Sequence, residues 1–255
     1  MDVTSPKNRP ATALCYVSSP EKLSVKTVAI LQSNYVPWKG YFDIIGNVDE
    51  FIVLDDVQFT KNDWRNRNLI KTRKGLEWLT IPVRQEFLAQ TIREIRIADS
   101  RWASRHFTTL SQAYSKCEFF LLYQERLKAL YNEAATLLQL SDVNALFLKN
   151  LCSFIGIKSK ISQSSDYELR GDRSSRLVSL CEQASANVYL SGPAAKSYLD
   201  VAAFQANGIE VRWMNYDDYP EYRQSFPPFA HGVSVLDLLF NTGPQCQKYM
   251  KSVST

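Results

Sequence analysis

Two adjacent carboxylates, Asp55 and Asp56, follow an apolar run at residues 51–54 that is typical of a buried β-strand. Carboxylates at the end of a strand can hold a sugar hydroxyl, a metal ion or a substrate ammonium group. Because successive side chains of a strand point to opposite faces, the two carboxylates are not expected to form a close acid–base pair. A solvated turn is the alternative interpretation.

The segment after these carboxylates contains more amide, guanidinium and indole groups than a structural turn needs. Its candidate residues are Gln58, Lys61, Trp64, Arg65, Asn66 and Arg67. The forked guanidinium groups of Arg65 and Arg67 match the geometry of a phosphate or a carboxylate. An exposed charged hairpin would also contain such residues, although a solvated loop has little use for Trp64. The segment therefore predicts an anion-binding site with an aromatic ring beside it.

A second group of candidates precedes the carboxylates, between an expected strand at residues 26–31 and an expected helix at residues 38–45. The group comprises Gln32, Tyr35, Trp38, Gly40 and Tyr41. In an open parallel sheet, this strand-to-helix loop faces the ligand crevice at the carboxyl ends of the strands. Gly40 would let a phosphate approach the backbone amides at the helix start. The alternative is that the aromatic rings anchor the loop in the core.

A third group follows an expected strand at residues 188–190. It comprises Ser191, Gly192, Lys196 and Tyr198. A hydroxyl, a backbone amide and a lysine in such a loop suit a phosphate, although an ordinary connection would also fit. Residues 216–229 have no regular period and predict a long loop that is laid over the body of the protein like a lid. Of the two histidines, His106 and His231, we interpret both as structural residues rather than catalytic bases.

The order of the expected elements indicates an α/β fold with a mainly parallel, nucleotidyltransferase-like or Rossmann-like sheet. Strands and helices alternate at both ends, and helical periodicity fills about residues 100–157. Further strands are expected at residues 78–83, 92–97, 160–164 and 209–214, and further helices at residues 176–186, 201–207 and 235–241. Ser141 and Ser234 are expected helix caps. We predict a flexible tail at residues 1–25 and a single α/β domain with a helical middle section at residues 26–250.

Composition indicates a globular chain and excludes several classes of protein. The 255 residues are 45% hydrophobic and 22% charged with a net charge of +4, which does not predict nucleic-acid binding. No apolar run has the length of a membrane span, and the N-terminus lacks the apolar core of a signal peptide. Cys15, Cys117, Cys152, Cys181 and Cys246 have wide spacing. This spacing predicts free thiols in a cytoplasmic protein without a metal site. Motifs of serine hydrolases, zinc proteases and P-loop proteins are absent.

Three motifs together resemble the WbqC-like family. They are LQSNYVPWKGYFDIIGNVDEFIVLDDVQFTKNDWRNRNLIK at residues 31–71, LSGPAAKSYLD at residues 190–200 and SVLDLLFNTG at residues 234–243. The resemblance covers about residues 26–245, with Ser33 where a proline is usual. Members of this family are usually linked to bacterial surface-polysaccharide gene clusters, so the resemblance implies handling of a sugar nucleotide or a lipid-linked glycan precursor.

The WKGY sequence at residues 38–41 is also similar to the HxGH turn of nucleotidyltransferase-like folds, with both histidines replaced. This similarity supports nucleotide binding. It puts adenylyl transfer in doubt, because those imidazoles stabilise the phosphate transition state.

From these observations we predict a transferase that moves an acyl or aminoacyl group onto the amine of a nucleotide-linked sugar in surface-polysaccharide (O-antigen) biosynthesis. Asp55, Asp56 and Lys61 are the predicted catalytic residues, and the other candidates are predicted to bind substrate. One alternative is an ATP-using nucleotidyltransferase-like enzyme or amide ligase. Another is a non-catalytic partner protein that binds a glycan precursor. The expected partners are a nucleotide sugar and an unidentified donor, without nucleic acid or membrane insertion. The sequence identifies neither a cofactor nor an oligomeric state.

Overall fold

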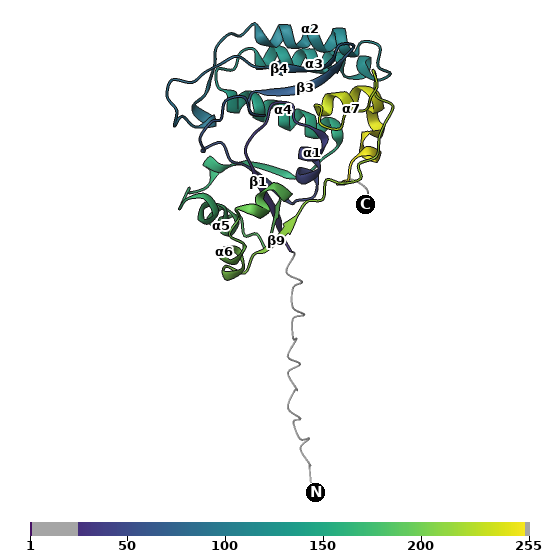
Figure 1. Ribbon diagram of the computed structural model, residues 1–255. Coiled ribbons are helices and arrows are strands. Elements are labelled where there is room, and N and C mark those ends of the chain that lie inside the picture. Colours follow the sequence, from purple (N-terminus) through teal and green to yellow (C-terminus); the bar gives the residue numbers. More distant parts are fainter. Residues whose placement is uncertain (2–24, 253–255) are drawn as a thin grey trace.

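The computed structural model describes Met1 and residues 25–252, so the tail expected at residues 1–25 lies almost entirely outside the described residues, as does Cys15. A five-stranded sheet forms the centre (Figure 1). Its strands are β1 (Thr27–Leu31), β2 (Glu50–Val53), β7 (Lys160–Gln163), β8 (Val188–Ser191) and β9 (Glu210–Trp213). They are all parallel, in the order β7-β2-β1-β8-β9. The expected α/β fold with a parallel sheet is confirmed.

Both faces of the sheet are covered, which explains why its strands are apolar runs rather than alternating ones. On one side lie α1 (Lys39–Gly46), α4 (Leu140–Ile155) and α7 (Val235–Thr242), with α2 (Trp102–Tyr114) and α3 (Phe120–Ala134) beyond α4 (Figure 1). On the other side lie α5 (Arg173–Gln183) and α6 (Val201–Ala206). Phe51 and Val53 of β2 pack in the first core, and Ile52 packs in the second with Phe204.

Between β2 and α2 the chain forms two small antiparallel sheets whose pairing the sequence did not predict, although the strand expected at residues 78–83 overlaps the end of β4 and the start of β5. One pairs β3 (Arg67–Thr72) with β4 (Gly75–Thr80), and the other pairs β5 (Val83–Arg84) with β6 (Arg96–Ile97). The expected strand at residues 92–97 is wrong in its first half, which is the 3₁₀ turn η1 (Ile92–Glu94). Glu94 accepts hydrogen bonds from the backbone and hydroxyl of Thr91, and this capping box stabilises the turn. The remaining 3₁₀ turns are η2 (Ser164–Asp166), η3 (Pro193–Ser197) and η4 (Gly243–Tyr249).

Two expectations about local chemistry have different outcomes. Ser234 caps α7, because its hydroxyl accepts a hydrogen bond from the backbone of Leu236 at 3.3 Å. Ser141 does not cap α4, which begins one residue earlier.

The four described cysteines are free and buried, as expected: Cys117, Cys152, Cys181 and Cys246. Among the described residues, no helix combines the length and the apolar composition needed to cross a bilayer.

The strands β1 and β8 separate early, and this separation opens the sheet toward a ligand. They pair only at Thr27 with Val188 and Val28 with Tyr189, whereas β1 and β2 pair at four successive positions. The chain leaves β1 toward β2 on one side and reaches β8 on the other side only after β7. The connections after β1 and β8 therefore run in opposite directions, which is the topological switch point where open α/β sheets bind ligands.

The opposite, amino-terminal edge of the sheet is held together by one buried carboxylate, Glu50. It forms ion pairs with Lys26 at 2.7 Å and Lys160 at 2.8 Å and accepts hydrogen bonds from Ser162 and Tyr167. Burial acts to raise the pKa of Glu50, but these hydrogen bonds outweigh burial and lower the pKa to about 2. A lowered pKa in the folded state stabilises the fold at pH values above the ordinary pKa of the group.

We predict that Glu50→Gln lowers the free energy of unfolding at neutral pH by roughly 2–3 kcal/mol, because each tenfold change in an acid dissociation constant corresponds to about 1.4 kcal/mol. The difference between wild type and variant should shrink as the pH falls from 4.5 toward about 2. Urea unfolding between about pH 7 and pH 3 measures this difference. The exposed Glu182→Gln is the control and should change little. A difference that does not depend on pH would contradict the assignment to Glu50.

Candidate functional site

A pocket of about 370 Å³ lies at the switch point, between the ends of β1 and β8. Its polar lining residues are Gln32, Asn34, Arg65, Ser191 and Gly192, and its apolar ones include Ile30, Leu54, Leu177 and Leu199. We call it the switch-point pocket. Its volume lies in the range of roughly 300–1,000 Å³ that is typical of small-molecule sites. It unites candidates from all three sequence groups, the last of which lies more than a hundred residues after the other two.

Arg65 provides the positive charge of this pocket. Its guanidinium donates hydrogen bonds to the carbonyl oxygen of Ser33 at 3.4 Å and to the side-chain oxygen of Asn34, and lies 3.5 Å from the carboxylate of Asp63. The Nε atom is buried and has no hydrogen-bond partner in the described structure. A guanidinium that these contacts fix in the wall of a pocket is suited to bind an anion there.

The opposite wall is the end of β8. The Gly192 N–H follows the last residue of the strand, and it makes no hydrogen bond within the part of the chain that the structure describes. A Cβ atom at this position would lie 3.9 Å from the hydroxyl of Tyr216. The backbone amide thus lies beside the pocket with little covering it, which suits contact with a phosphate oxygen.

A second pocket of about 380 Å³ adjoins the first. Its lining residues are Asn34, Pro37, Trp38, Trp64, Asn68, His231 and Gly232, and we call it the aromatic pocket. Asn34 lines both pockets and is their common wall. Trp38 is held edge-to-face against Tyr216 at a centroid distance of 5.2 Å, and Trp64 packs against Trp78 at 5.3 Å.

Gly40 serves this aromatic pocket rather than a phosphate. A Cβ atom on Gly40 would lie 2.3 Å from the ring of Trp38, so only glycine lets this ring lie across the start of α1. Lys39, the neighbouring residue, is buried against the ring of Tyr219 and donates to the carbonyl oxygen of Pro220 at 3.2 Å. The phosphate site expected at this helix start is therefore wrong.

His231 is an exposed residue on the rim of the aromatic pocket. From the sequence we had interpreted this histidine as structural. Burial of its ring and then the charge of Lys39 lower the pKa of His231, while Glu221 acts in the opposite direction. The imidazole is consequently neutral near pH 7 and can accept a proton. His106, by contrast, is buried, and burial lowers its pKa to about 4. It bridges Tyr35 and the Thr80 carbonyl, which is a structural role.

The structure places the two carboxylates on opposite faces of the sheet, and neither is available as a catalytic base. Asp55 is fully buried and accepts hydrogen bonds from the Ser33 backbone at 2.9 Å and the Ser141 hydroxyl at 2.6 Å. Asp56 forms two hydrogen bonds with Arg93, at 2.8 and 3.1 Å. Burial acts to raise the pKa of Asp56, but hydrogen bonds from Arg93 and Ser164 outweigh burial and hold the pKa below its ordinary value.

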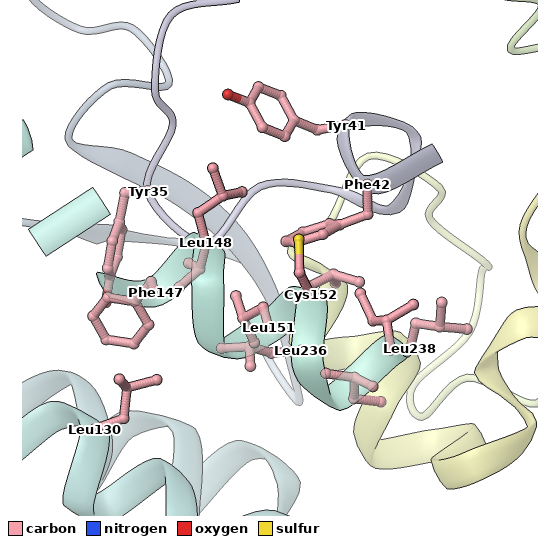
Figure 2. Packing of buried hydrophobic residues seen from close by; sticks show 14 of the residues in the cluster. Tyr35, Tyr41, Phe42, Leu130, Phe147, Leu148, Leu151, Cys152, Leu236 and Leu238 are labelled. Carbon is pink, nitrogen blue, oxygen red and sulfur yellow. The ribbon is translucent and has the colours of Figure 1, made fainter. Parts of the chain in front are cut away.

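The two tyrosines of the first loop have different positions. Tyr35 is fully buried, donates to His106 and packs edge-to-face against Phe147 at 5.5 Å, so it cannot stack on a ligand (Figure 2). Tyr41 points away from that part of the core, and its ring lines the switch-point pocket (Figure 2). Its hydroxyl donates to the carbonyl oxygen of Gln32 at 2.8 Å, which fixes the pocket wall.

Several other candidates lie outside the switch-point and aromatic pockets. Lys61 is exposed and forms no ion pair in the described structure, and Lys196 is exposed beside the ring of Trp213. Asn66 is buried and donates to the Ile81 carbonyl oxygen at 2.9 Å. Arg67 stacks on Trp78 at 4.1 Å and donates to the carbonyl oxygen of Asn62. Gln58 lines a third pocket. Tyr198 is the exception among these candidates, because it lines both the third pocket and the switch-point pocket.

Sequence reasoning missed Asn34, Asn68 and His231 as site residues. Asn34 and Asn68 lie inside the first motif, and polarity alone did not separate them from their neighbours. His231 gave no spacing signal, because it reaches the site from a loop nearly 200 residues after β1.

Comparison with known proteins assigns the family. The WbqC-like protein family matches residues 32–249. The chain belongs to this family. It is 45% identical over 228 residues to a Mycobacterium tuberculosis (strain ATCC 25618 / H37Rv) protein named "Uncharacterized protein Rv1507c". The aligned region covers 89% of this chain and 98% of that protein. No solved structure matches the chain. Family membership is confirmed, and the name of the relative states no activity.

If Asp55 is a structural residue of this WbqC-like protein, Asp55→Ala should lower the free energy of unfolding by about 3 kcal/mol or more, because two hydrogen bonds to a buried charge are lost. Asp55→Asn should cost less, since its amide oxygen can still accept one of them. Urea unfolding monitored by tryptophan fluorescence measures both. Asp142→Ala removes an exposed carboxylate from the first turn of α4 and should change stability by about 0.5 kcal/mol. Equal stability of Asp55→Ala and this control would contradict the structural role.

Proposed function

We propose that this WbqC-like protein is a transferase that moves an acyl or aminoacyl group onto the amine of a nucleotide-linked sugar. The observation that carries the proposal is the joining of two pockets through Asn34. One has the charge and backbone chemistry for phosphate, and the other has the rings and the neutral imidazole for a sugar amine.

The nucleotide diphosphate is assigned to the switch-point pocket. Arg65 and Gly192 both line it, and the guanidinium and the backbone N–H would bind phosphate oxygens. Apolar side chains such as Ile30 and Leu31 line the remainder and would contact the base or ribose. Ligands of open α/β sheets bind in this position, beyond the carboxyl ends of the strands.

The sugar is assigned to the aromatic pocket, on the other side of Asn34. Trp38 and Trp64 offer apolar ring faces to the sugar, and amide groups of Asn34 and Asn68 lie beside them for its hydroxyls. His231, on the rim, would be near the amine substituent. The association of this family with surface-polysaccharide genes, implied by the sequence motifs, agrees with an amino sugar as substrate.

The reaction requires one deprotonation before the acyl group can transfer. An amine that is protonated at neutral pH has no free electron pair, so His231 takes one proton from the ammonium group. The amine nitrogen then attacks the acyl carbonyl carbon of an activated donor and forms the C–N bond. The bond from that carbon to the donor's leaving group breaks, the leaving group departs with the electron pair, and the second nitrogen proton passes to it or to water.

We predict that Arg65→Gln weakens binding of nucleotide amino sugars at least tenfold, because a charge-assisted contact to phosphate is lost. Calorimetric titration with uridine, thymidine and guanosine diphosphate amino sugars measures the affinity. Lys61→Gln and Arg67→Gln are matched controls, since these cations lie outside the pocket. The proposal fails if no nucleotide sugar binds. Binding of ATP alone, with pyrophosphate release, would identify the ligase alternative instead.

His231→Gln should lower kcat at least a hundredfold while substrate affinity changes little, because it removes the base and keeps a side chain of similar length. In wild type, kcat should fall only when the pH drops below the ordinary histidine value of 6.5, since the pKa of His231 is lowered. Amide formation is followed by mass spectrometry. The N-acetylated counterpart of each sugar is the negative control, and an unchanged kcat in the variant would exclude His231 as the base.

A further inference from the structure

A third pocket, of about 680 Å³, adjoins the switch-point pocket on the side away from Asn34. Leu54, Leu177, Tyr198 and Leu199 line both pockets, so the two hollows are continuous along the carboxyl edge of the sheet. The surface of this pocket is mainly apolar, and two arginines from the start of α5, Arg173 and Arg176, are among its lining residues. We call it the arginine pocket.

The acidic side chains around the arginine pocket already have hydrogen-bond partners within the protein. Asp56 is paired with Arg93, and Asp172 accepts a hydrogen bond from the Ser175 hydroxyl at 3.0 Å. Arg176 donates only to carbonyl oxygens, those of Asp56 at 3.3 Å and Gly171 at 3.2 Å.

Arg173 makes neither a side-chain hydrogen bond nor an ion pair within the described part of the chain. Two guanidinium groups therefore border an apolar hollow with no carboxylate ion-paired to either of them among the described residues. A guanidinium beside an apolar hollow is stabilised by an anion, and phosphate matches its fork.

We propose that the arginine pocket binds the donor substrate, an activated acyl compound that carries a phosphate group. The phosphate would lie against Arg173 and Arg176, and the acyl chain would lie over Leu54, Leu177 and Leu199 toward the switch-point pocket. This assignment to a donor rests on the proposed transferase function. The shared lining residues place the bound donor next to the bound nucleotide sugar, as transfer between two substrates requires.

The probe for the test is octyl phosphate, titrated into the full-length protein by calorimetry, with octanoate and octanol as probes of the same chain length. Octyl phosphate should bind saturably, and octanol should bind at least tenfold more weakly. Arg173→Gln and Arg176→Gln should each weaken octyl phosphate binding at least fivefold. Arg170→Gln is the matched control, because Arg170 is an exposed arginine three residues before Arg173 and six before Arg176, and it pairs with Glu168. Arg173→Gln keeps the assay interpretable if loss of the Arg176 hydrogen bonds unfolds the protein.

Equal affinity in the variants and the control, or the absence of saturable binding, would overturn the proposal. Binding of octanoate as strong as that of octyl phosphate would overturn the phosphate assignment. Displacement of octyl phosphate by octanoyl phosphate or by octanoyl-coenzyme A would identify the source of the phosphate, and displacement by neither would overturn the donor assignment. The outcome is separable from the proposed function, because nucleotide-sugar binding depends on Arg65 and is measured independently. Loss of one kind of binding with retention of the other identifies which proposal has failed.

Discussion

The buried carboxylate of Asp55 is the interaction on which the candidate site depends. It connects the end of β2 to the backbone of Ser33 in the first loop and to Ser141 in α4. Ser33 accepts a hydrogen bond from Asn144, which also donates to the backbone oxygen of Arg65 at 2.9 Å. The carboxylate of Asp55 thus holds together three segments that are distant in the sequence. Because an unpaired buried carboxylate is costly, the loop and α4 are fixed together.

Two further buried carboxylates hold the wall of the site formed by residues 215–233. Tyr219 donates to Asp43 of α1, and Tyr222 donates to Asp237 of α7 at 2.6 Å. Burial raises the pKa of Asp237, against the effect of the hydrogen bonds from Tyr222 and its neighbours. The segment that the sequence suggested as a lid is therefore fastened along its length, and His231 extends from its end into the aromatic pocket. This arrangement gives the imidazole a fixed position at the rim.

The sequence predicted the sheet well, because buried parallel strands are continuous apolar runs with glycine or polar residues at their ends. Every predicted strand of the central sheet is present within one or two residues. The prediction failed between β2 and α2, where short-range pairing decides: η1 replaces a strand because Glu94 caps it, and β3 has a partner only because β4 follows. Polarity located the crevice but not the role of each residue. The polar groups of Asp55 and Tyr35 form buried hydrogen bonds within the protein. A sequence cannot distinguish such a residue from one that contacts a ligand.

The distance in the sequence between β1 and β8 has a consequence for the order in which the protein is made. A ribosome that has released the first 155 residues has produced β1, β2 and the long helices, and with them Arg65 and the tryptophans of the aromatic pocket. It has not yet produced Ser191, Gly192 or His231, which form the other half of the wall. Ligand therefore cannot assist the folding of the nascent amino-terminal part. The crevice exists only once the last third of the chain has emerged and β8 has joined β1 along the two residue pairs that they share.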